Sequence, residues 1–342
     1  DLKNFPLSHL SPGAGFVFAR SSWDEDATFF FFKCGDRFTA HQHLDNGHFV
    51  IWKNNELAGD GGHYDEFGTP HDVNYHLRTI AHSTMLVRDP AETWPNIRAG
   101  KVEVNDGGQA HPWPHHNGSV ADPEEWARGK EIYDIADLRA FDDQGDYLYA
   151  AGDCTRSYSP KKVDWFTRQI VFLRPGTFVI FDRVKSKNPS FEKTWLLQAM
   201  KTPEILKAGP GKSPILRITN GGGRLFVQTL FPRNPRTRLV SGEGLYTFDG
   251  KSFPPSRITG PAPECRIEIS PNTSSREDFF LHVLTAADSA VDTVPAAIVK
   301  DAGDEIAVTT GGVTVMFRKG RPGGGITRNG KTIMLKESIM AR

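Results

Sequence analysis

The sequence is a succession of short runs of β-branched and aromatic residues, each closed by Gly, Asp, Asn or Pro. Such runs between turn-forming residues are typical of β-strands. In the first part of the chain they lie at residues 27–34 (ATFFFFKC), 47–54 (GHFVIWKN), 83–89, 101–106, 146–153, 165–184 and 193–200. Because helical periodicity is nearly missing between them, we predict an all-β fold built on a large antiparallel β-sandwich.

Two turns and one helix can be placed from local signals. Pro175-Gly176 divides the run 165–184 into a hairpin, and Asn329-Gly330 between apolar runs predicts a two-residue hairpin turn. Residues 122–138 are the best helix candidate, with Pro near the start and acids in the first turn.

The amino-acid composition of the chain changes after about residue 235. Loop-like stretches rich in Pro, Ser and Gly come first. Short strand-like runs then return at residues 265–269, 278–286, 296–301, 305–320 and 325–335. We therefore predict two all-β units, residues 1–235 and a smaller one at 236–342.

Composition excludes several functions. Lys+Arg and Asp+Glu are both 41, so no net field draws nucleic acid or a membrane surface, although local basic patches could hold an acidic polymer. No run is long and apolar enough to span a bilayer. Three scattered cysteines exclude a disulfide framework, leaving one disulfide or, as we expect, three buried thiols. The chain starts at Asp1 without initiator Met or signal peptide, as expected of a fragment or processed product.

The histidines are concentrated in one region. Seven of the twelve lie between His41 and His82. If residues 41–43 form a strand, His41 and His43 project from the same face. A return strand ends at Asp60, and His82 opens another run, so His43, Asp60 and His82 could converge on one Zn²⁺ ion.

Simpler interpretations exist for each of these residues. Asp60 lies among glycines and could be only a turn residue. His63, His71 and His76 are expected to be loop residues, and the histidines of the segment 111–116 (HPWPHH) fit a rim loop. A different metal chemistry is also open, because His43-x-Asp45 with a distant histidine is the pattern of a non-haem iron oxygenase.

The region around these histidines resembles the heparinase II/III-like polysaccharide lyases. Residues 41–49 fit an HxHxDxGxF pattern, 60–64 fit DxGxY, and 74–83 fit NYxxRTxAHN, with Ser83 in place of the final Asn. Segments 20–35, 105–109, 166–173, 179–184 and 193–198 resemble further strands of the family in the same order. The resemblance runs from about Ser21 to Ala199.

The resemblance implies roles for individual residues. His43, Asp60 and His82 correspond to the ligands of a structural zinc ion, and His41 to a histidine that faces the substrate. A catalytic or sugar-binding tyrosine corresponds to either Tyr64 or Tyr75. As contacts to the sugar polymer we predict aromatic and basic loop residues, namely Arg78, Trp94, Arg98 and Trp113.

The resemblance also implies a function and a partner. Its members cleave uronic-acid-containing polysaccharides such as glycosaminoglycans by β-elimination, and they are secreted or periplasmic bacterial proteins. They carry an N-terminal helical toroid that supplies much of the catalytic apparatus. This chain resembles only the C-terminal half, so we expect the toroid to be its partner. The alternative from another class is a carbohydrate-binding or structural β module without turnover.

Overall fold

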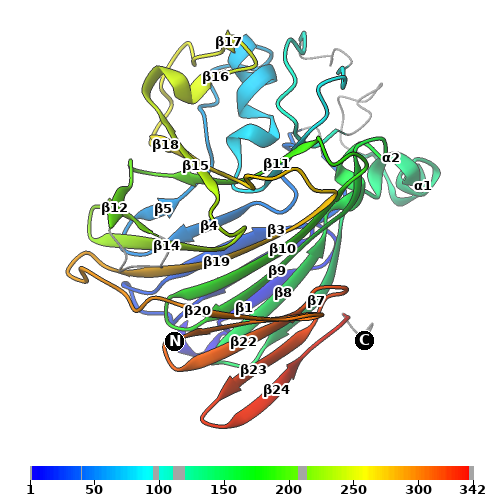
Figure 1. Cartoon of the computed structure of the whole chain (residues 1–342). Helices are drawn as coiled ribbons and strands as arrows, with labels where there is room; N and C mark the ends of the chain where they lie inside the picture. Colours follow the sequence, from blue (N-terminus) through cyan, green and yellow to red (C-terminus); the bar gives the residue numbers. More distant parts are fainter. Residues whose placement is uncertain (1, 40, 95–99, 111–119, 207–213, 339–342) are drawn as a thin grey trace.

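A computed structural model describes residues 2–39, 41–94, 100–110, 120–206 and 214–338. Its strands form three stacked sheets, which confirms the predicted all-β class (Figure 1). Every strand pairing in the described residues is antiparallel. Figure 1 places the C-terminal sheet at the bottom and the segments that hold the candidate site at the top.

The first sheet has nine strands in its described part. In spatial order they are β1 (Ser8–Ser11), β2 (Phe16–Arg20), β3 (Phe29–Lys33), β4 (Phe49–Trp52), β5 (Glu56–Ala58), β11 (Glu192–Ala199), β18 (Cys265–Ser270) and β15 (Arg236–Ser241), with β6 (Met85–Arg88) also paired to β11. Short helical turns lie in the connections at η1 (Leu2–Asn4), η2 (Asp72–His76, a π-helix), η3 (Thr79–Ala81), η4 (Thr155–Ser157) and η5 (Gly242–Tyr246).

The second sheet has eight strands and the third has five, again in the described residues. The second runs β12 (Glu204–Leu206), β13 (Ile215–Asn220), β14 (Gly223–Phe231), β19 (Glu277–Asp288), β10 (Thr177–Ser186), β9 (Val163–Leu173), β8 (Tyr147–Asp153) and β7 (Asp137–Asp143). The third runs β20 (Ile298–Ala302), β21 (Glu305–Thr310), β22 (Val313–Arg318), β23 (Gly324–Arg328) and β24 (Lys331–Leu335). A two-stranded hairpin, β16 (Thr247–Phe248) and β17 (Lys251–Ser252), lies apart from them.

The middle sheet is buried on both faces. Ile170 and Ile180 point into the core shared with the nine-stranded sheet, whereas their neighbours Val171 and Val179 point into the core shared with the five-stranded sheet. Since successive residues of a strand face opposite sides, a sheet covered on both sides needs unbroken apolar runs. This explains why residues 165–184 lack the alternation of a half-exposed strand.

Both predicted hairpin turns are confirmed. Arg328 pairs with Lys331 across Asn329-Gly330, and these two turn residues have φ values of 50° and 75°. Asn and Gly tolerate such left-handed backbone better than other residues. Leu173 likewise pairs with Thr177 across the turn that contains Pro175-Gly176.

Two local predictions need correction. The helix expected at 122–138 is two short helices, α1 (Pro123–Arg128) and α2 (Lys130–Tyr133), and strand β7 begins within its predicted range. Residues 101–106 form no strand. Their backbone is held by side chains instead, since the Asn74 amide bonds both the Lys101 carbonyl and the Glu103 N–H.

The sandwich continues past the boundary predicted at residue 235. Strands β15, β18 and β19 follow that boundary, yet they pair within the two large sheets. Strand β19 lies between β14 and β10, so it closes the centre of the middle sheet. The sheet β20–β24 is separate from the two large sheets, and its inner face covers the middle sheet.

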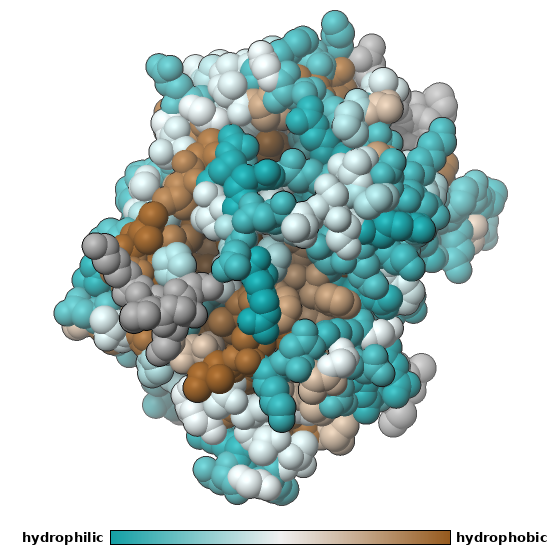
Figure 2. All heavy atoms as spheres, in the orientation of Figure 1, coloured by the Kyte–Doolittle hydropathy of each residue, from teal (hydrophilic) through white to brown (hydrophobic). Residues whose placement is uncertain are grey.

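The surface and the cysteines add two further facts. Figure 2 shows a largely hydrophilic face, with hydrophobic atoms gathered toward its left and lower centre. In the described part of the chain no helix is long and apolar enough to cross a membrane. Cys34, Cys154 and Cys265 are all buried, as expected, and no bond joins their sulfur atoms in this structure.

Candidate active site and metal centre

Three connections bring His43, Asp60 and His82 together. His43 lies between β3 and β4, Asp60 follows β5, and His82 lies between η3 and β6. Residues 41–43 are not a strand, because β4 begins only at Phe49. The predicted residues therefore converge, but through irregular segments at strand ends and not through a shared strand face.

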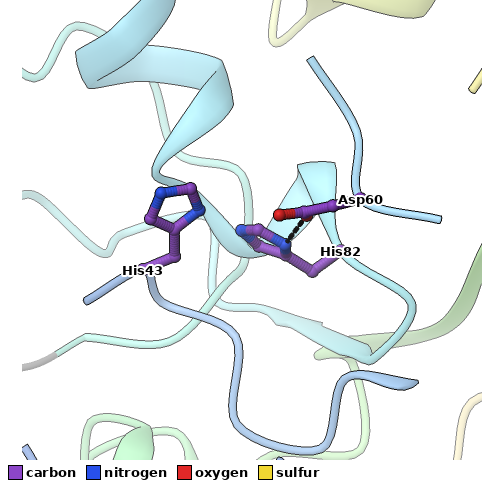
Figure 3. Close-up of side chains that lie close together, drawn as sticks. All are labelled: His43, Asp60 and His82. Atoms are coloured by element: carbon purple, nitrogen blue, oxygen red, sulfur yellow. Dashed lines mark ion pairs between the residues drawn. The ribbon is translucent and has the colours of Figure 1, made fainter. Parts of the chain in front are cut away.

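The geometry of these three side chains is compact. One ligand atom from each lies within 4.8 Å of the others. His82 Nδ1 is 2.5 Å from Asp60 Oδ1, and Figure 3 shows the His43 ring facing His82 from the opposite side. His82 is fully buried; its Nδ1 faces Asp60, and its Nε2 has no hydrogen-bond partner among the described residues.

The protonation states of His43 and Asp60 are those that suit a bound cation. Burial, with the nearby His82, lowers the pKa of His43 to about 3, so this imidazole is neutral at pH 7. Burial opposes ionisation of Asp60, but the adjacent His82, His48 and His43 outweigh it and hold the pKa of Asp60 well below its usual value. Burial also acts against the charged form of His82, but Asp60 raises its pKa overall.

The donor set fits a zinc ion. Two imidazole nitrogens and one carboxylate oxygen are the ligands that Zn²⁺ prefers, with a fourth place left for another group. The buried Nε2 of His82 also needs a partner, because leaving such a polar group unsatisfied costs about 1–3 kcal/mol. A cation bound between the three side chains would give the His82 ring a partner and would also interact with the Asp60 carboxylate.

The Asp60 and His82 segments are joined by their backbones. Gly61 N–H donates to the Ala81 carbonyl at 2.8 Å. A Cβ atom at Gly61 would lie 2.5 Å from that oxygen, so only glycine allows the approach. Gly62 has φ +84°, which a side chain would also disfavour. The two glycines after Asp60 therefore set its position against His82.

The His43 segment is fixed by amide side chains. Asn46 N–H donates to Gln109 Oε1 at 2.9 Å, and Gln109 Nε2 donates to the Asn46 carbonyl at 2.6 Å. Asn46 Oδ1 in turn accepts from the Gly35 N–H, which closes the base of the loop. Thr79 Oγ1 donates to the Leu44 carbonyl next to His43. The resemblance at residues 105–109 therefore has a structural reason, because Gln109 holds the histidine loop.

A buried arginine ties two of the histidine segments to the sandwich. Arg168 makes two hydrogen bonds to Asp182, at 2.8 and 2.7 Å, and both side chains are fully buried. Its remaining amino group donates to the carbonyls of Gly47 and Ser83, which precede His48 and follow His82. Arg168 therefore holds the backbone at Gly47 and Ser83, on either side of the candidate site, against the middle sheet.

We expect Arg168→Met to be strongly destabilising. The substitution leaves Asp182 buried and unpaired and frees the Gly47 and Ser83 carbonyls, and breaking such a pair costs about 3–5 kcal/mol. The free energy of unfolding from denaturant titration measures this loss. The double variant Arg168→Met/Asp182→Leu should recover part of it. A single-variant loss below about 1 kcal/mol would contradict the positioning role.

The predicted catalytic residues separate by exposure. His41 is exposed and Tyr64 is 48 % exposed, so both can meet a ligand. Tyr75 is fully buried in η2, and burial raises its pKa to about 12. A hydroxyl in that position does not face a polymer, so the structure favours Tyr64 over Tyr75.

His76 is a site residue that the sequence analysis missed. Its ring centroid lies 4.7 Å from that of His43 and 6.1 Å from that of Tyr64. Burial lowers its pKa, and it packs between the candidate metal ligand His43 and the exposed Tyr64. The missing signal is the π-helical turn at Asp72–His76, which turns His76 toward the cluster.

The predicted sugar contacts are only partly accessible. Arg78 is 3 % exposed, forms an ion pair with Asp106 and lies 4.1 Å from the Trp94 ring. A side chain this buried does not present its guanidinium to a polymer, so Arg78 has a structural role. Trp94 is half-buried over it. Arg98 and Trp113 lie outside the described residues.

Three other histidines of the region, His48, His63 and His71, make hydrogen bonds that connect separate segments. His48 Nδ1 accepts from the Ser83 N–H at 2.9 Å. His71 donates from Nδ1 to the Phe253 carbonyl at 2.6 Å and accepts the His63 N–H, which fastens the segment around Phe253 to the site. The loop assignment holds for His63, which lies outside the helices and strands although it is buried. His71, also predicted to be a loop residue, is buried at the start of η2.

The structure gives structural roles to Ser83, where the sequence departs from the family motif, and to Asp45, the ligand of the alternative iron site. Ser83 Oγ accepts from the Gln198 N–H at 3.0 Å, so the residue that departs from the family pattern is a buried link to strand β11. Asp45 forms a buried ion pair with Lys33 and does not belong to the candidate metal group. An iron site using Asp45 would have to break that pair.

Sequence comparison decides the family. The family model described as "Heparinase II/III-like, C-terminal" matches residues 6–250, which include the whole histidine cluster. The chain belongs to the heparinase II/III-like C-terminal family. No curated protein sequence matches the chain.

Solved structures of this heparinase-like type share the fold. A structure of a heparinase III gene product has a TM-score of 0.62 at 16 % identity, covering 91 % of this chain and 42 % of that one. Heparan sulfate lyase HepC from Pedobacter heparinus has a TM-score of 0.61 at 16 % identity, covering 100 % of this chain and 44 % of that one. At such identities the likeness concerns the fold. The chain spans less than half the length of these structures.

Proposed function

We propose that this chain is the β-sandwich portion of a polysaccharide lyase that cleaves uronic-acid-containing polymers by β-elimination. The observation that carries the proposal is the family match over residues 6–250, which contains the metal group and exposed His41 together. Its structural neighbours include a heparinase III and a heparan sulfate lyase, and this supports a glycosaminoglycan as the substrate. A secreted or periplasmic location belongs to the same proposal.

The chemistry requires three kinds of group. The C5 proton of a uronate is barely acidic while the neighbouring carboxylate is charged, so a positive or hydrogen-bonding partner must stabilise the developing anion. A base must then take the C5 proton, and an acid must protonate the leaving oxygen. His41 and Tyr64 are the exposed candidates on this chain, and the remaining groups would come from a helical domain.

We assign the metal a structural role on His43, Asp60 and His82. A zinc ion there would join the three connections that carry these residues. It would also fix the loop that carries His41, two residues before His43. The charge of the ion would balance the Asp60 carboxylate beside the imidazoles of His43 and His82.

The isolated chain should cleave polyuronates poorly or not at all. A polymer held between two domains has its reacting atoms aligned by both, and a misplacement of about 1 Å can cost a factor of 10² in rate. The assay is the ultraviolet absorbance of unsaturated uronate ends, with residues 1–342 alone and with the helical segment supplied covalently or in trans. A neutral polysaccharide is the control substrate.

Each outcome of this assay has a definite meaning. Cleavage only with the helical segment supports the division of labour. Robust cleavage by residues 1–342 alone would place the whole catalytic set on this chain, around His41 and Tyr64. If polyuronates are bound but not cleaved, both by residues 1–342 alone and with the helical segment present, the chain is better explained as a carbohydrate-binding module. That result would overturn the lyase proposal.

A further inference from the structure

Two of the three buried thiols meet in the core of the sandwich. Cys34 follows strand β3 of the nine-stranded sheet, and Cys154 follows strand β8 of the eight-stranded sheet. Their sulfur atoms are 3.5 Å apart, and both residues are fully buried. The third cysteine, Cys265, lies on strand β18.

The surroundings of the pair leave space for sulfur. A Cβ atom at Gly152 would lie 2.5 Å from the Cys34 sulfur, so the missing side chain makes room for it. On the other side, a Cβ atom at Gly47 would lie 3.5 Å from the Cys154 sulfur, which places Cys154 beside the base of the histidine loop. The thiols otherwise make only long contacts, of 3.4 and 3.7 Å, from Cys34 to the Asp137 and Asp153 carbonyls.

We propose that Cys34 and Cys154 form a disulfide that links the two large sheets beneath the histidine loop. A sulfur–sulfur bond measures about 2.05 Å, so the two atoms must approach by about 1.5 Å, which side-chain rotation can supply. The proposal does not depend on the lyase function. It gives the base of the loop a covalent anchor next to Gly47.

The oxidation balances with a small-molecule disulfide as the oxidant. The two S–H bonds of Cys34 and Cys154 break and one S–S bond forms. Two electrons pass to the small disulfide, which becomes two thiols and takes up both protons. Because both cysteines are buried, the exchange takes place before the sandwich closes, and the finished bond is then shielded from reductants.

The bond should stabilise the fold noticeably. It closes a loop of 120 residues, and the loss of chain entropy in the unfolded state grows with loop length. We expect the oxidised chain to melt roughly 5 to 10 °C above the reduced chain. Cys265→Ser should preserve this difference, whereas Cys34→Ala/Cys154→Ala should abolish it.

The direct test uses the wild-type chain. It is unfolded and refolded in a buffer of oxidised and reduced glutathione, then denatured with iodoacetamide and digested. We expect one alkylated cysteine, Cys265, and a linked peptide pair containing Cys34 and Cys154. Alkylation of all three cysteines, or a linkage that involves Cys265, would overturn the proposal. In the folded oxidised chain, a thiol reductant without denaturant should leave the link intact.

Discussion

Metal analysis of the His43→Ala chain should show loss of the bound ion. One of three ligands is removed, and the remaining two, Asp60 and His82, form an ion pair with each other. A ligand that binds only the folded state stabilises it by about 4 kcal/mol at a thousand-fold excess over its Kd. The variant should therefore also melt well below the wild type, and added zinc should no longer raise its melting temperature.

The matched control for this substitution is His9→Ala. His9 is exposed on the edge strand β1 and lies outside the candidate metal group. This variant should keep both the ion and the melting temperature. If His43→Ala retained a full equivalent of metal, the ligand assignment would be wrong.

His41→Ala should have the largest effect on turnover. In the protein that includes the helical domain, we expect the substitution to leave folding and metal content unchanged while turnover falls by about 10² to 10⁴, the range typical of an acid–base or electrostatic group. His41 is exposed and lies outside the metal group, so neither packing nor metal binding explains such a loss. Metal content, melting temperature and kcat measured on one preparation separate the roles.

A result near wild-type activity would remove His41 from the site. In that event His76, which lies beside His43, and Tyr64, which lies beside His76, would be the next residues to substitute. Loss of activity together with loss of metal would instead make His41 a structural residue.

Local features of the fold could be predicted from the sequence, but which strands pair with each other could not. Asn329-Gly330 determines its own hairpin, because its backbone preference acts over two residues. The place of β19 depends on strands β10 and β14, which are far away in the sequence. Nothing in its composition says which sheet it joins, and this is why the boundary at residue 235 fell inside the sandwich.

The candidate site, too, was only partly predictable from the sequence. The pattern of the sequence identified His43, Asp60 and His82, because ligand types and motif order are visible in it. It could not show that Arg78 is buried against Asp106, or that a π-helical turn brings His76 to the cluster. Both depend on tertiary packing, which periodicity does not encode.

The measurement that tests the function most directly is the mass of the product released from a polyuronate by the protein that includes its helical domain. β-Elimination breaks the glycosidic bond without adding water, so the new end carries a carbon–carbon double bond. The account predicts oligosaccharides that lack one water relative to hydrolysis products and that absorb in the ultraviolet, with no oxygen taken up from labelled water. Products with an added water molecule, labelled at the new end, would contradict it.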